Sequence, residues 1–207
     1  MNARFWAVPV CGSALVLVGL VAREVVGQTW PWLAFNLLLA WIPLLLGAVA
    51  SRHPGLLVAL GLPWLLFLPN APYLLTDLCH LKARAPVPLW FDTALLGGTG
   101  ALGIAIGVAS LHQVVGAVHA WFGRWPAVAV WFGAPIASGF GMYLGRFLRW
   151  NSWNVVTRPY ELVADIADIL LHPAAHVDAW AYTATFGGLF LVAALGPRPA
   201  PVVSSAT

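Results

Sequence analysis

The chain has 207 residues, of which 61% are hydrophobic and only 8% are charged. Charged residues make up about a quarter of a soluble globular domain, so the composition excludes that class. The formal net charge is +3 and the basic residues form no run, which argues against nucleic acid as a partner. The 12 tryptophans are typical of membrane interfaces, where the ring lies at headgroup level. These properties predict a multi-pass protein of the cell membrane that is surrounded by membrane lipid.

The apolar stretches of the chain are long enough for six membrane crossings, each of which needs about 20 residues. We predict spanning helices over residues 5–22, 31–50, 55–75, 90–111, 125–147 and 179–196. Arg23 and Glu24 follow the first stretch in place of a small-residue cleavage site, so we expect a retained helix and not a signal peptide. The expected fold is an all-α transmembrane bundle. It forms one domain over residues 1–196, with a disordered Pro-rich tail over residues 197–207.

Helices that cross in alternate directions bring polar residues from several spans to one membrane face. The residues assigned to this face are Asn36, Asn70, Tyr73, Asp77, Trp90, Asp92, Tyr143, Arg146, Arg149 and Asn151. An unpaired polar group in hydrocarbon costs several kcal/mol, so we expect these groups to satisfy one another. The connectors at this face hold six Lys and Arg residues against four on the opposite side. This bias is too small to orient the chain in the membrane.

The motif GRFLRWNSW at residues 145–153 concentrates polar groups at the end of the fifth predicted helix. Arg146 and Arg149 are three residues apart and would share a helical face. Two adjacent guanidinium groups repel unless an anion lies between them, and Arg binds carboxylate or phosphate through a planar fork. Asp77 and Asp92 are the internal candidates for that anion, and a ligand is the external one. The motif therefore predicts either Arg–Asp pairs that tie helices together or an anion site.

Residues 68–73, LPNAPY, place two prolines near the end of the third predicted helix. Each proline removes a backbone donor and interrupts the helical hydrogen bonds. Asn70 is suited to cap a new short helix with Pro72 in its first turn. The N-terminus of such a helix would offer N–H groups to an anion. The alternative is a simple proline kink.

Residues 161–172, ELVADIADILLH, have the periodicity of a short amphipathic helix with an acidic polar face. We expect it to pack over the basic face of the bundle or to face water. A divalent-metal site formed with His172 and His176 is an alternative, but a solvated face is the preferred interpretation. His112 and His119 cannot be paired with a histidine on another span at the same depth, which argues against haem. We therefore predict no metal and no cofactor.

Four segments of the chain together resemble one known family. They are NLLLAWIPLLL (36–46), WLLFLPNAPYLLTDLCHL (64–81), WFD (90–92) and GMYLGRFLRWNSWNV (141–155). The resemblance is to the DUF1361 family of bacterial integral membrane proteins, and it covers residues 30–195. It implies a polytopic membrane protein and brings no known function with it. The family pattern often has Asp after the second Trp of the last motif, where this chain has Asn154. That departure argues against a mechanism that needs a carboxylate there.

The leading functional hypothesis is binding or transport of an anionic lipid headgroup or small anion. In this hypothesis the two arginines hold the anion, the aspartates orient them and the asparagines position the ligand. The predicted site residues are Arg146, Arg149, Asn151, Asn70, Tyr73, Asp77, Asp92, Asn36 and Trp153.

Two alternatives belong to other functional classes. A membrane enzyme acting on a lipid-linked phosphate would use Asp77 or Asp92 as base and His80 or Tyr143 as proton donor. A structural subunit would dock another membrane protein through the acidic face of residues 161–172. The small-residue run over residues 97–107 would allow close packing within the bundle or between copies.

Overall fold

The computed structural model describes residues 3–26 and 29–196, and within these ranges every regular element is a helix. The tail over residues 197–207, predicted to be disordered, lies outside the described residues. Six helical segments are long and apolar enough to cross a membrane. They are Phe5–Val25, Pro31–Ala50, Pro54–His80, Leu89–Phe122, Arg124–Phe147 and Val177–Ala194. The expected all-α polytopic bundle is therefore confirmed.

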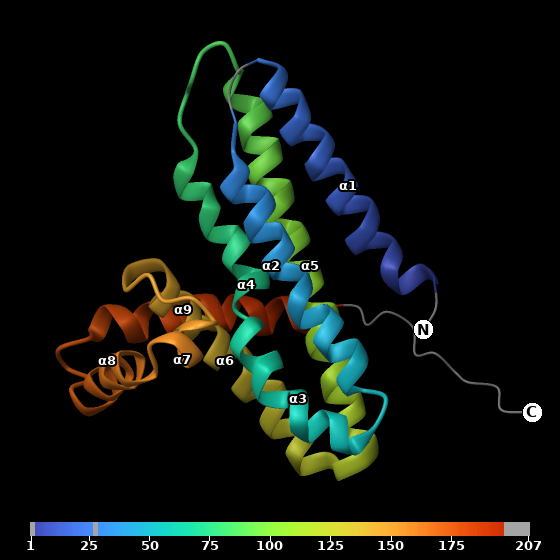
Figure 1. Ribbon diagram of the computed structural model, residues 1–207, viewed down its shortest axis with the longest axis vertical. Coiled ribbons are helices and arrows are strands. Elements are labelled where there is room, and N and C mark those ends of the chain that lie inside the picture. The colour runs from blue at the N-terminus through green and yellow to red at the C-terminus, as the bar shows by residue number, and fades with distance from the viewer. Residues whose placement is uncertain (1–2, 27–28, 197–207) are drawn as a thin grey trace, which may run out of the picture.

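In chain order the helices are α1 (Ala3–Val25), α2 (Pro31–Ala50), α3 (Pro54–Phe67), α4 (Asn70–Tyr73), the 3-10 helix η1 (Leu74–His80), α5 (Leu89–Phe122), α6 (Arg124–Phe147), α7 (Asn154–Thr157), α8 (Pro159–Leu171) and α9 (Val177–Ala194). α1, α2 and α5 run along the length of the molecule, whereas α9 lies across this direction (Figure 1). The ends of α1 and η1 lie at the same end of the molecule as the starts of α2 and α5. α6 packs closely on α9, and α7 and α8 lie beside this pair, away from α1.

α5 is longer than the sequence predicts. His112 and His119 lie within it, so the connector expected over residues 112–124 is wrong. Its 34 residues extend about 51 Å, which exceeds the roughly 30 Å hydrocarbon core and requires tilt or extension beyond it. The polar residues that end the apolar stretch do not end the helical backbone. The helix ends at Gly123, whose φ of 89° is readily adopted only by glycine, and α6 begins at the next residue.

The third span is interrupted at Leu68 and Pro69, between the end of α3 and the start of the short helix α4 at Asn70. Leu68 and Pro69 keep right-handed helical angles, and the Ala71 N–H donates to the Leu68 carbonyl. The Phe67 carbonyl therefore loses its usual helical donor, and the Asn70 side-chain nitrogen donates to it at 2.9 Å. A capping side chain must accept from backbone N–H groups, whereas Asn70 donates to a carbonyl. The predicted Asn70 cap is therefore wrong, although the predicted short helix with Pro72 in its first turn is present as α4. The Ala71 and Tyr73 N–H groups donate to the Leu68 and Pro69 carbonyls, so they are not offered to an anion as predicted.

Small residues allow close contact between helices inside the bundle. A Cβ atom at Gly103 in α5 would lie 2.3 Å from the carbonyl oxygen of Ala71 in α4. A Cβ atom at Gly139 in α6 would lie 2.5 Å from the carbonyl oxygen of Thr183 in α9. Gly103 belongs to the small-residue run over residues 97–107, so that run contributes to packing within the bundle.

Candidate functional site

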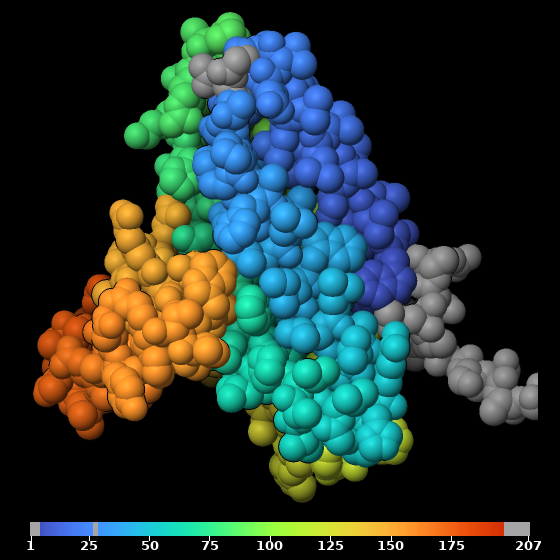
Figure 2. Space-filling model, in the orientation of Figure 1, coloured from blue at the N-terminus to red at the C-terminus, as the bar shows by residue number. Residues whose placement is uncertain are grey.

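A pocket of about 290 Å³ lies between α2, the kink from α3 to α4, α6 and α8. Most of its lining is apolar and includes Phe35, Leu39, Leu65, Phe140, Leu144 and Ile166. Its polar lining residues are Asn36, Asn70, Tyr73, Asn151 and Ser152. Figure 2 shows the chain after α6, in orange, lying against the side of α2 and of the α3–α4 segment. The pocket therefore has an apolar wall and a polar cluster that the motif of residues 145–153 helps to form.

Hydrogen bonds connect that motif to the proline kink. The Asn70 side-chain nitrogen donates to Ser152 Oγ at 3.1 Å as well as to the Phe67 carbonyl. Ser152 Oγ in turn donates to the Leu66 carbonyl at 2.8 Å. Polar side chains thus satisfy backbone groups that the interrupted helix leaves available at membrane depth. Ser152 was not among the predicted site residues, and its place inside the polar motif was the signal that could have identified it.

Asp77 and Arg146 lie together beside the pocket. The Asn36 side-chain nitrogen donates to Asp77 Oδ2 at 3.0 Å, and Asp77 is only 1% exposed. Arg146 donates to Cys79 Sγ and also interacts with the Tyr73 hydroxyl and the Asp77 carboxylate. The structure thus brings together the α2, η1 and α6 residues that the sequence assigns to one face. Arg146 itself does not line the pocket, but its partner Tyr73 does.

Asp92 lies elsewhere, in a buried ion pair with Arg23. The two Arg23 nitrogens Nε and Nη2 each donate to one Asp92 oxygen at 2.8 Å. The guanidinium also stacks on Trp30, with Cζ 3.5 Å from the ring centroid. The expectation that Asp92 faces Arg146 or Arg149 is wrong. Arg23 lies in the last turn of α1 and Asp92 in the first turn of α5, so these two charges meet at the same depth on neighbouring helices.

Arg149 does not share a helical face with Arg146. α6 ends at Phe147, and Arg149 has a φ of 60°, in the left-handed region. The Trp150 N–H then donates to the Leu144 carbonyl at 3.1 Å, which closes the helix end. The Arg149 side chain is exposed, and the predicted shared helical face of the two arginines is wrong. A helical spacing rule fails here because the helix stops between the two residues.

The remaining aromatic and amide groups of the motif lie near the pocket mouth. Asn151 is exposed and lines the pocket, and its N–H donates to Asn154 Oδ1 at 2.7 Å. Trp153 is 39% exposed and its ring contacts that of Phe35 edge-on, with 6.4 Å between centroids. Trp153 therefore connects the motif to α2 without lining the pocket.

α8 confirms the predicted amphipathic helix and covers one side of the pocket with Leu162 and Ile166. Its acidic face is divided between protein and water. Asp165 Oδ2 accepts from Trp150 Nε1 at 2.8 Å. Glu161 pairs with Arg158 on the surface, and this partner holds the pKa of the Glu161 carboxyl below its usual value. The acidic face is therefore largely exposed, and its contact with the preceding loop, at Asp165, is with an indole N–H and not with the basic residues expected.

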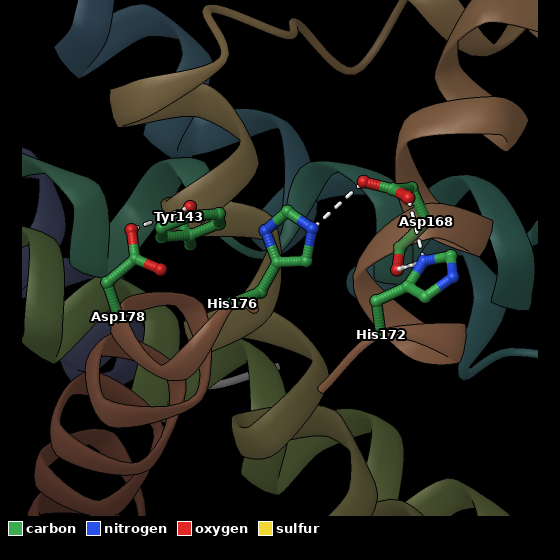
Figure 3. Close-up of polar contacts among 5 residues, drawn as sticks. All are labelled: Tyr143, Asp168, His172, His176 and Asp178. Carbon is green, nitrogen blue, oxygen red and sulfur yellow. Dashed lines mark hydrogen bonds and ion pairs between the residues drawn. The ribbon is translucent and has the colours of Figure 1, made fainter. Parts of the chain in front are cut away.

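Hydrogen bonds to the Asp168 carboxylate connect the end of α8 to the start of α9 (Figure 3). His172 Nδ1 lies 2.8 Å from Asp168 Oδ1, and His176 Nε2 lies 2.9 Å from Asp168 Oδ2. These two hydrogen bonds hold the pKa of the Asp168 carboxyl below its usual value. Within residues 3–26 and 29–196, no group of three His, Cys, Asp or Glu residues is arranged to hold a metal ion. The hydrogen bonds of Asp168 to His172 and His176 therefore stabilise the turn between α8 and α9.

The acid–base pairs of the enzyme hypothesis are not assembled in the pocket. Asp92 is committed to Arg23, and Tyr143 donates to Asp178 Oδ2 at 3.0 Å (Figure 3). Neither residue lines the pocket, and both are buried. Asp77 and His80 lie close to Arg146, but they are not pocket-lining residues either.

Comparison with known proteins identifies one family. The family model described as "Protein of unknown function (DUF1361)" matches residues 35–193, which is most of the chain. The match contains the kink, the motif of residues 145–153 and every residue that lines the pocket. No curated protein and no solved structure matches the chain.

Proposed function

We propose that this chain, which belongs to the DUF1361 family, binds the headgroup end of a phospholipid of the cell membrane in the pocket between α2, α6 and α8. The observation that carries the proposal is the composition of the pocket wall. Apolar side chains from α2, α3, α6, α7 and α8 surround a small cluster of amides and hydroxyls. Ligand pockets of this kind hold an apolar body and orient it by a few polar contacts.

The charge beside the pocket favours a phosphate-bearing ligand over a neutral one. Arg146 reaches Tyr73, which lines the pocket, and a guanidinium binds phosphate through its planar fork. Arg146, Arg84 and Lys82 all lie near enough to His80 for their positive charges to act on its ring. Asp77 offsets part of this positive potential and orients Asn36. A free small anion is a poorer match, since most of the lining would offer it no polar contact.

The test uses native mass spectrometry of the protein purified in mild detergent and titrated with phospholipids of defined headgroup. Ala137 lines the pocket, so Ala137→Phe should fill it and reduce phospholipid occupancy at least tenfold. Arg146→Ala should weaken binding about tenfold, the loss expected for one charge-assisted hydrogen bond. Arg149→Ala is the matched control, because it removes the same charge from an exposed position outside the pocket wall.

The structural-subunit and enzyme hypotheses make different predictions for the same samples. Folded Ala137→Phe protein with wild-type phospholipid occupancy would refute the pocket proposal. Chemical conversion of a bound lipid would instead establish turnover, and a stoichiometric protein partner without bound lipid would favour a structural role.

A further inference from the structure

The polar end of the pocket contains two asparagine amides whose orientation is fixed by their partners. The Asn36 nitrogen donates to the Asp77 carboxylate at 3.0 Å, and the Asn70 nitrogen donates to the Phe67 carbonyl at 2.9 Å. A carboxylate and a carbonyl oxygen can only accept hydrogen bonds. Each amide must therefore present its nitrogen to the protein and keep its oxygen, Oδ1, on the other side.

Both amide oxygens remain available to a ligand. Among the described residues, neither Asn36 Oδ1 nor Asn70 Oδ1 accepts a hydrogen bond. A partnerless side-chain oxygen is either buried or accessible, and neither of these two oxygens is buried. Both can therefore be reached by a ligand. Since both residues line the pocket, these oxygens offer two acceptors at its polar end.

The neighbouring hydroxyl groups add a third acceptor and one donor. Ser152 gives its proton to the Leu66 carbonyl and receives one from Asn70, so its unused capacity is a lone pair. Tyr73 receives a hydrogen bond from Arg146, which can only donate, and in the part of the chain that the structure describes the Tyr73 hydroxyl has no acceptor for its proton. The fixed part of the site therefore accepts more hydrogen bonds than it donates.

We infer that the preferred phospholipid carries O–H or N–H donors on the group attached to its phosphate. This inference rests on the proposed pocket and specifies its ligand. A headgroup hydroxyl or primary ammonium satisfies the two amide oxygens, while Tyr73 donates to the phosphate and Arg146, behind Tyr73, stabilises its negative charge. A headgroup without such donors would cover the Asn36 and Asn70 oxygens without forming hydrogen bonds to them, and this unpaired state lowers its affinity.

The test compares headgroups that have equal charge but differ in donors, with identical acyl chains. Phosphatidylethanolamine and phosphatidylcholine form one pair, because full methylation of the amine keeps its charge and removes every N–H. Phosphatidylglycerol and phosphatidylmethanol form the other, because both have one negative charge and only the first has hydroxyls. At least one pair should show a preference of tenfold or more for the donor headgroup. The pair that does so identifies the donor as amine or hydroxyl.

A variant then assigns the preference to an amide oxygen. Asn36→Leu removes one acceptor and should reduce the ratio of the two affinities within the responding pair. The headgroup comparison on wild-type protein tests the inference even if this variant does not fold. Equal binding within both pairs, with all binding lost in Ala137→Phe, would overturn the inference and leave the proposed pocket intact. Binding that Ala137→Phe does not affect would instead remove the pocket proposal on which it rests.

Discussion

The buried ion pair between Arg23 and Asp92 is expected to hold α1 against α5. Only 11% of the spanning window of α1 is buried, and its closest packing places Gly12 and Gly19 against leucines of α5. Lipid chains are as apolar as leucine, so burial of apolar surface contributes little to association between helices in a membrane. A bidentate ion pair at this contact is therefore a major part of what positions α1.

The magnitude follows from the burial and geometry of the pair. The Arg23 side chain is 0% exposed and that of Asp92 is 1% exposed. Removing one partner of a buried pair costs about 3–5 kcal/mol, because the other charge remains without compensation. The Trp30 ring remains against Arg23 and retains part of the stabilisation. Asp92→Leu should therefore lower the free energy of unfolding by about 3 kcal/mol, roughly a 100-fold change in the equilibrium constant.

A double-mutant cycle separates this pair from the effects of each substitution. We expect Arg23→Leu with Asp92→Leu to be more stable than either single variant, because no isolated charge remains. SDS titration of detergent-solubilised protein, followed by tryptophan fluorescence, measures the four stabilities. Arg158 and Glu161 form an exposed ion pair with side-chain exposures of 54% and 59%, and the same cycle there should show little coupling. Additive effects of the two substitutions at 23 and 92 would refute the reasoning.

Two further substitutions test packing and the turn between α8 and α9. Gly103→Ala should destabilise the protein by about 1–3 kcal/mol, because its Cβ meets the Ala71 backbone, whereas Gly97→Ala, with nothing within 4 Å, should not; equal effects in the SDS titration would contradict this. The lowered pKa of Asp168 means that its stabilisation is complete above the usual Asp value near 3.9 and is lost as pH falls through the lowered value. Asp168→Asn should therefore speed amide hydrogen exchange in residues 172–178 at neutral pH. In this variant, acidification should raise the exchange rate less than it does in the wild type. Unchanged exchange in the variant would contradict the role of the carboxylate.

Hydropathy predicts the spans of this protein because water is absent from the bilayer core, where a helix must satisfy its own backbone. The same argument gives the depth of each polar residue, and so it places Asn36 and Asp77 at one level. Depth does not give direction around the helix axis. Asp92 was therefore assigned to the arginines of α6, although its partner, Arg23, is on the neighbouring α1. A charge near a helix end has several possible partners at the same depth, and only the packing of helices selects one.

Backbone conformation set a second limit on prediction from sequence. The spacing of Arg146 and Arg149 suggests a shared face only if the helix continues through both. Arg149 instead occupies the left-handed region, which costs about 1–3 kcal/mol for a residue other than glycine. Nothing in the local sequence indicates this conformation. The hydrogen bonds that follow it, from Trp150 to Leu144 and to Asp165, are the contacts that hold the loop there.

The polar density of residues 145–153 therefore has more than one physical cause. Ser152 bonds to the backbone at the kink, and Trp150 bonds to α8. These groups already form hydrogen bonds within the protein, so their substitution will disturb the fold whether or not a ligand binds. Asn36 and Asn70 differ, because each keeps an unused acceptor at the pocket. Ligand recognition is best sought at atoms with capacity left after the fold is satisfied, and the headgroup comparison is directed at those two oxygens.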